Sequence, residues 1–235
     1  MTESEKYSKK REANRLGLQR FFLNVENNHY DFVANKLINE LEKKLIELRH
    51  EIKSDIKGPG YMKYMDVYFL EKRLFAISEM KILYAYKHFE IHLKFLIKAS
   101  YQEVKESGLY KWQMVEDFLK SKKINPKKLA NYVEMRDLRN LNNNIKHARN
   151  ILDNKTKNIL EFQNKKELKY TDLLNFYRRV ENSGFKFLKS LSNEIDKDLY
   201  EFNDDRLEEI SEKLVYRMNS KAINKLISKL ENKNH

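Results

Sequence analysis

The chain has 235 residues, of which 41% are hydrophobic and 35% charged, and its formal net charge is +12. This length can bury a sizeable core, and the 13 phenylalanines and 14 tyrosines carry too much apolar surface for a disordered chain. The absence of cysteine excludes disulfides and thiolate metal sites. Five glycines and two prolines are too few for the many tight turns of an all-β protein, so we expect an all-α fold.

The first residues, Met1 to Lys6, contain no apolar run after a basic start, so we expect no signal peptide. No stretch approaches the roughly 18 uncharged apolar residues that a membrane-spanning helix needs. Both observations favour a cytoplasmic protein without a membrane partner.

The N-terminal part, residues 1–57, is predicted to form a helical hairpin. Its first helix is expected from about Glu5 to Leu23, and its second from Tyr30 to Ile56, where apolar residues recur at helical spacing. Gly58-Pro59-Gly60 then interrupts the chain.

The next predicted helix is the longest and runs from about Tyr64 to Lys105. Because it is apolar around most of its circumference, several neighbours should bury it, and we expect it to be the central element. A shorter helix follows Gly108 and carries Trp112. Asn125-Pro126 then resembles an N-cap and first position, which predicts a helix from there to about Ile145.

The stretch from residue 150 to 169 is polar and is expected to be irregular, with Ile159–Phe162 forming a short strand or a packed loop. Two closing helices are predicted, near Thr171–Leu199 and Asp204–Leu230.

Helices joined by short connections pack mostly antiparallel. We therefore predict a single domain, an antiparallel helical bundle around one long central helix. Its expected parts are the hairpin over residues 1–57, a core over 64–200 and a C-terminal helix over 204–232.

The positive charge is concentrated in the middle of the chain. Residues 111–169 contain 15 Lys and Arg against 7 Asp and Glu, a net +8. Such a surface attracts RNA or DNA phosphate, although a solvated lysine face needs no ligand. Lys122 and Lys123 precede the next helix, where they form either a solvated turn or a guide for a phosphate backbone.

One face of the helix after Pro126 gathers groups that suit a phosphodiester. At 100 degrees per residue, four polar side chains fall within an arc of roughly 100 degrees around Arg139. They are Arg136, Asn143, Lys146 and His147. Leu138, Leu141 and Ile145 fall on the other side and would anchor the helix. Alternatively, these polar residues only form the C-terminal end of the helix, because cations are common in the last turn of a helix.

These groups predict either binding or metal-free cleavage of RNA. Arg139 and Arg136 would bind the scissile phosphate, and His147 would exchange the proton. Asn143 or Asn140 would orient the reacting groups. Neighbouring cations at Lys146 and Arg149 would add substrate contacts, and a second subunit could supply a second histidine.

The pattern Arg139-x-x-Asn142-Asn143-x-x-Lys146-His147, entered through residues 133–138, resembles the signature helix of the HEPN superfamily. The resemblance covers roughly residues 64–195. It implies an α-helical bundle, frequent homodimerisation, and often metal-independent RNase activity in antiviral defence or toxin systems. It also implies that Arg139 and His147 are the catalytic pair, that Asn140 assists, and that Glu90 could pair with the signature arginine.

Two other readings of the chain stay open. Seven residues separate Arg139 from His147, more than the family's nuclease motif usually has, and some members are non-catalytic modules. The protein would then bind nucleic acid, a partner protein or an antitoxin through its basic face. A purely structural helical subunit is the third reading.

No cofactor or metal is expected. His88 and His92 are spaced to share a metal, but no third ligand is evident. Trp112 could stack a base, although anchoring a short helix is its more common role. No Gly-rich phosphate loop is present, which argues against an NTPase.

Overall fold

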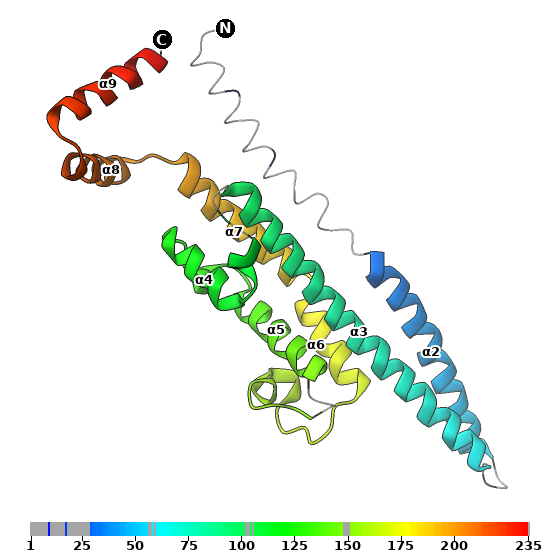
Figure 1. Cartoon of the computed structure of the whole chain (residues 1–235). Helices are drawn as coiled ribbons and strands as arrows, with labels where there is room; N and C mark the ends of the chain where they lie inside the picture. Colours follow the sequence, from blue (N-terminus) through cyan, green and yellow to red (C-terminus); the bar gives the residue numbers. More distant parts are fainter. Residues whose placement is uncertain are drawn as a thin grey trace. The chain divides into compact units, whose positions relative to one another are not determined.

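A computed structural model describes residues 29–55, 58, 60–101, 104, 106–147 and 151–234, together with Lys9 and Gly17. Apart from those two residues, the helix expected from Glu5 to Leu23 lies outside the described residues. Every regular element in the described part is an α-helix or a 3-10 turn, which confirms the all-α prediction (Figure 1).

The α-helices follow one another along the chain with these bounds: α2 (His29–Ser54), α3 (Tyr61–Ser100), α4 (Trp112–Ser121), α5 (Tyr132–His147), α6 (Tyr170–Val180), α7 (Ser183–Tyr200), α8 (Asp204–Arg217) and α9 (Ser220–Asn234). The 3-10 turns are η2 (Glu106–Leu109), η3 (Pro126–Lys128), η4 (Thr156–Asn158) and η5 (Leu160–Phe162). The segment Ile159–Phe162 is therefore a turn rather than a strand.

The chain divides into two compact units, one running from Val25 to Ser190 and the other containing Leu191–His235. Within the first unit, α3 packs against α2, α5 and α6, as its broad apolar surface predicts. A buried apolar cluster joins α2, α3 and α6, and its members are Ile38, Leu45, Leu70, Leu74 and Leu174.

The turn between α2 and α3 depends on Gly58. Its φ is +82°, a left-handed conformation that side chains disfavour, and its N–H donates to the Asp55 carbonyl at 3.1 Å. The chain can therefore reverse within six residues, which places α2 and α3 side by side and antiparallel (Figure 1).

The helix predicted to open at Pro126 begins later, at Tyr132. Asn125 is a cap as expected, because its Oδ1 accepts from the Lys127 N–H at 3.1 Å, but it caps only the η3 turn. Asn131 then has a φ of +57°, which no α-helix can contain, so α5 starts immediately after it.

The helix expected over Thr171–Leu199 is two helices, α6 and α7, separated by Glu181 and Asn182.

The helix expected over Asp204–Leu230 is also two, α8 and α9. Asn219 explains this break, because its Oδ1 accepts from the Ala222 N–H at 2.9 Å and thereby caps the start of α9. Asn203 caps α8 in the same way, accepting from the Arg206 N–H at 3.0 Å. The side chains of α8 include none that is buried. Among the described residues, no helix is long and apolar enough to cross a bilayer.

Candidate functional site

Helix α5 packs into the core through its apolar side. Met135, Leu138 and Leu141 are buried, and α5 packs on α3 and α6 through such residues. Helical geometry then turns Arg139 and Asn143, one turn apart, away from this core. Arg139 and Asn140 are half-buried, whereas Asn143 is exposed.

The single tryptophan is fixed beside this helix. Trp112 begins α4, and its Nε1–H donates to Glu116 Oε1 at 2.6 Å. The Tyr132 hydroxyl donates to the same oxygen at 2.8 Å, so α4 and α5 share one buried carboxylate. The indole ring also contacts Phe89 and Phe187, with ring centroids 6.3 and 6.2 Å away. Trp112 therefore anchors the short helix α4 to the core, which is the more common of the two roles expected for it.

The Arg139 guanidinium lies over the Trp112 ring, 5.0 Å from a ring centroid. This contact lets a planar cation stay charged while its side chain is ordered by packing. The pair lines a pocket of about 280 Å³. The complete lining is Trp112, Arg139, Asn140, Asn143, Asp153 and Lys155. We call it the Arg139 pocket.

Asp153 and Lys155 reach the Arg139 pocket from the segment after α5, and sequence reasoning missed both. The Asn144 amide positions this segment by donating to the Ile151 carbonyl at 2.9 Å. Asp153 Oδ1 then accepts from the Thr156 N–H at 2.7 Å and the Thr156 hydroxyl at 2.6 Å. No local sequence signal marks either Asp153 or Lys155 as part of the pocket.

Hydrogen bonds and a nearby cation favour the charged form of Asp153. Burial acts to raise the pKa of the carboxyl, but hydrogen bonds from the side chain and backbone of Thr156, with the backbone N–H and the charge of Lys155, outweigh it, so the pKa is lowered. The carboxylate therefore gives the Arg139 pocket an acceptor beside its cations. Guanidinium, ammonium, amide and carboxylate groups together could bind a phosphate and the polar edge of a base.

Glu90 lies close to this site but pairs with a neighbour on its own helix. Its Oε1 accepts from Lys94 Nζ at 2.8 Å. Burial and Glu90 raise the pKa of Tyr86 to about 12, while Arg139 acts to lower it. Glu90 and Arg139 therefore have opposite effects on the pKa of the Tyr86 hydroxyl.

The remaining predicted residues lie outside the Arg139 pocket. Arg136 Nη2 contacts Asp137 Oδ1 at 3.3 Å, and Lys146 and His147 are exposed at the end of α5 without lining the pocket. Lys122 Nζ lies over the Tyr101 ring at 4.7 Å, and the neighbouring Lys123 is exposed. Arg149 lies outside the described residues.

The two spaced histidines of α3 contact each other. Their ring centroids are 4.1 Å apart, and burial followed by the charge of His92 lowers the pKa of His88. Within the described part of the chain, no group of three or more His, Asp or Glu side chains could hold a metal ion.

Comparisons of the chain with protein-family models, with curated proteins and with solved structures gave no match.

Proposed function

We propose that this is a HEPN-like helical protein that binds single-stranded RNA, holding one nucleotide at the Arg139 pocket. The observation that carries the proposal is the Arg139 guanidinium, ordered over Trp112 in a pocket that also contains Lys155. Its fork of donors fits a phosphate, and its planar face can stack an unpaired base.

The amides of the pocket favour RNA over DNA. Asn140 and Asn143 lie one turn or less from Arg139, and an amide can both donate to and accept from a ribose 2′-hydroxyl. The Asp153 carboxylate can accept from an exocyclic amino group of a base. The surrounding residues 111–169, with their net +8, supply the long-range attraction that brings a strand to the site.

The test is the binding of a labelled single-stranded oligoribonucleotide, followed by fluorescence anisotropy. Arg139→Ala should weaken binding by about tenfold or more, because a charged, forked donor is lost. Arg178→Ala is the matched control, since Arg178 is exposed and its guanidinium contacts Asn175 outside the Arg139 pocket. Equal effects of the two substitutions would show that only net charge matters and would contradict the proposal.

A second function, metal-independent RNA cleavage, is favoured by the exposure of His147 on the same helix as Arg139. Eight residues of helix put the two about 80 degrees apart around the axis and about 12 Å apart along it. We therefore propose that each catalytic site takes its imidazole from one copy of the chain and its guanidinium from the other, in the homodimer that the HEPN resemblance implies.

Cleavage in EDTA tests this second function. His147→Ala should abolish cleavage but leave binding intact, and Arg139→Ala should abolish cleavage and weaken binding by about tenfold or more. Mixing the two inactive variants should restore part of the activity, because a mixed dimer has one site with both groups. Failure of the wild-type protein to cleave RNA would remove the catalytic proposal and leave the binding proposal standing.

A further inference from the structure

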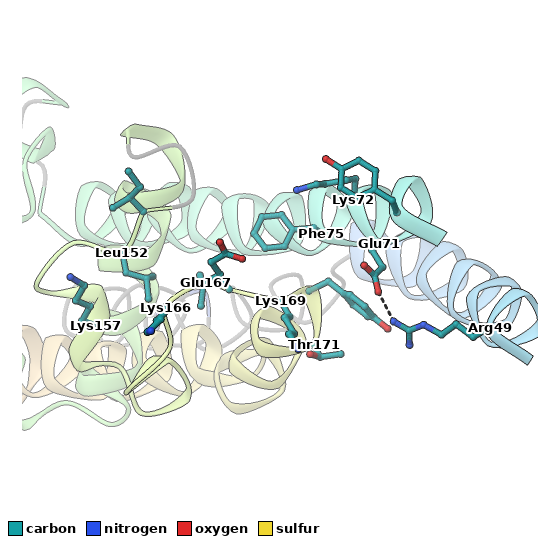
Figure 2. Close-up of a pocket in the computed structure, with 14 residues that line it drawn as sticks. Arg49, Glu71, Lys72, Phe75, Leu152, Lys157, Lys166, Glu167, Lys169 and Thr171 are labelled. Carbon is teal, nitrogen blue, oxygen red and sulfur yellow. Dashed lines mark hydrogen bonds and ion pairs between the residues drawn. The ribbon is translucent and has the colours of Figure 1, made fainter. Parts of the chain in front are cut away.

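The first unit contains a second and larger pocket, of about 920 Å³, which none of the predicted site residues lines. One wall is α3, with Lys72 and Phe75 facing the pocket (Figure 2). The segment from Lys166 to Thr171 forms another wall, and an ion pair between Arg49 and Glu71 lies at one end. We call this the α3 pocket.

Positive charge dominates the α3 pocket. Four lysines line it, namely Lys72, Lys157, Lys166 and Lys169. The Glu71 carboxylate is neutralised by Arg49, so Glu167 is the one further carboxylate among the lining residues, all of which are described. The lysines are exposed and spread along the pocket, with Lys157 and Lys166 at the end away from Arg49 (Figure 2).

Aromatic rings also line the α3 pocket. Tyr68 is 49% exposed, and Lys72 Nζ lies 5.3 Å from its ring centroid. Phe75 and Tyr170 also line the pocket and are half-buried. A positively charged groove with rings that can stack bases is the usual arrangement for single-stranded nucleic acid.

The α3 pocket and the Arg139 pocket share one thin segment of chain. Leu152 and Lys157 line the α3 pocket, whereas Asp153 and Lys155 line the Arg139 pocket. Consecutive Cα atoms are about 3.8 Å apart, so the two pockets adjoin along this segment. A strand that occupies one pocket therefore reaches the other within a few nucleotides.

We infer that the α3 pocket is a second RNA subsite, which binds neighbouring nucleotides of the same strand that the Arg139 pocket holds. This inference rests on the proposed RNA binding. Phosphates lie against Lys157, Lys166 and Lys169, and one base stacks on Tyr68. Spread cations favour a strand over a free nucleotide, whose phosphates need donors that converge on one point.

The experiment compares a short RNA of about two nucleotides, which occupies one pocket, with a long RNA of about twelve nucleotides, which spans both pockets. The variants are Lys157→Ala/Lys166→Ala and Tyr68→Ala, all at exposed positions that should tolerate truncation. Their matched controls are Lys221→Ala/Lys225→Ala and Tyr216→Ala, which remove the same groups from exposed positions on α9 and α8.

The long RNA should bind at least about tenfold more weakly to each subsite variant, while the controls stay near wild type. For the double lysine variant, the slope of log K against log salt concentration should become shallower by about 1.4, because two phosphate contacts are lost. Binding of the short RNA should depend on Arg139 and be nearly unaffected by the subsite variants. Glu167→Gln should strengthen binding of the long RNA.

Two results would overturn the inference while sparing the proposed function. One is RNA binding that needs Arg139 but ignores the Lys157/Lys166 and Tyr68 substitutions at every length. The other is that ATP displaces a labelled long RNA from the α3 pocket as effectively as unlabelled long RNA does, which would make the pocket a nucleotide site. Absence of any RNA binding by the wild-type protein would overturn both proposals.

Discussion

Tyr86 shows how a single buried group responds to the charges of the candidate site. It is 8% exposed on α3, and burial together with Glu90 raises the pKa of its hydroxyl to about 12. Arg139 acts in the opposite direction. The tyrosine is therefore neutral in the folded protein under conditions where an exposed tyrosine would begin to ionise.

This shift predicts a loss of stability in alkali. The folded pKa lies above the unfolded value of 10.0, so the stabilisation is complete below that pH and is lost as the pH rises toward about 12. Its size should be roughly 2–3 kcal/mol. Urea unfolding at several pH values should show a steeper alkaline decline for wild type than for Tyr86→Phe, which lacks the ionisable group. Identical declines would contradict the buried, shifted hydroxyl.

The site residues differ in how far the sequence could predict them. Arg139, Asn140 and Asn143 could be predicted to share a face because helical periodicity fixes their directions. The same reasoning grouped them with Arg136 and His147, which do not line the pocket, because a shared face says nothing about what covers it. Asp153 and Lys155 enter through a tertiary contact of Asn144, and no local pattern encodes that.

At the scale of elements, one ionic cluster joins α2, α3 and α6. Lys81 is 3% exposed on α3, and its Nζ lies 3.3 Å from Asp31 Oδ1 and 4.1 Å from the centroid of the Tyr177 ring. The Tyr177 hydroxyl donates to Asp31 Oδ2, and Asn35 accepts from Lys81. A buried ammonium is stable there only because these partners replace water.

Asp31→Ala should lower the free energy of unfolding by about 3 kcal/mol or more, because it leaves the Lys81 charge buried without its carboxylate. Replacing both residues, Asp31→Leu with Lys81→Met, should recover much of this loss. Asp117→Ala is the matched control, since the Asp117–Lys120 pair is exposed and should contribute less than about 1 kcal/mol. Urea denaturation followed by circular dichroism measures all three, and a double variant no better than the single one would contradict the argument.

Apolar spacing predicted where the helices lie better than it predicted where they begin and end. The length and central position of α3 follow from its apolar surface. The start of α5 was placed too early because Asn125-Pro126 caps a short turn as readily as a long helix, and only the backbone at Asn131 separates the two. The polar segment between α5 and α6 has no periodicity, so its two 3-10 turns could not be predicted.

At the scale of the whole molecule, the Arg139 pocket and the α3 pocket both lie within the unit from Val25 to Ser190. The other unit contains α8 and α9, whose exposed apolar side chains include Leu207, Val215 and Tyr216. Homodimerisation stays a prediction, and the mixed-variant cleavage experiment depends on it. Because both pockets belong to the first unit, the proposed RNA binding can be tested without knowing the number of copies in the assembly.

Trp112 offers the most direct test, because it is the only tryptophan of the chain and lines the Arg139 pocket. Titration of the wild-type protein with single-stranded RNA should change the intrinsic fluorescence of Trp112 until the site is saturated, because a base and a phosphate bind to Arg139 beside the indole ring. Arg139→Ala should lose this change at the same RNA concentrations, while Arg178→Ala should keep it. RNA binding detected by anisotropy, with Trp112 fluorescence unchanged and no effect of Arg139→Ala, would contradict the account.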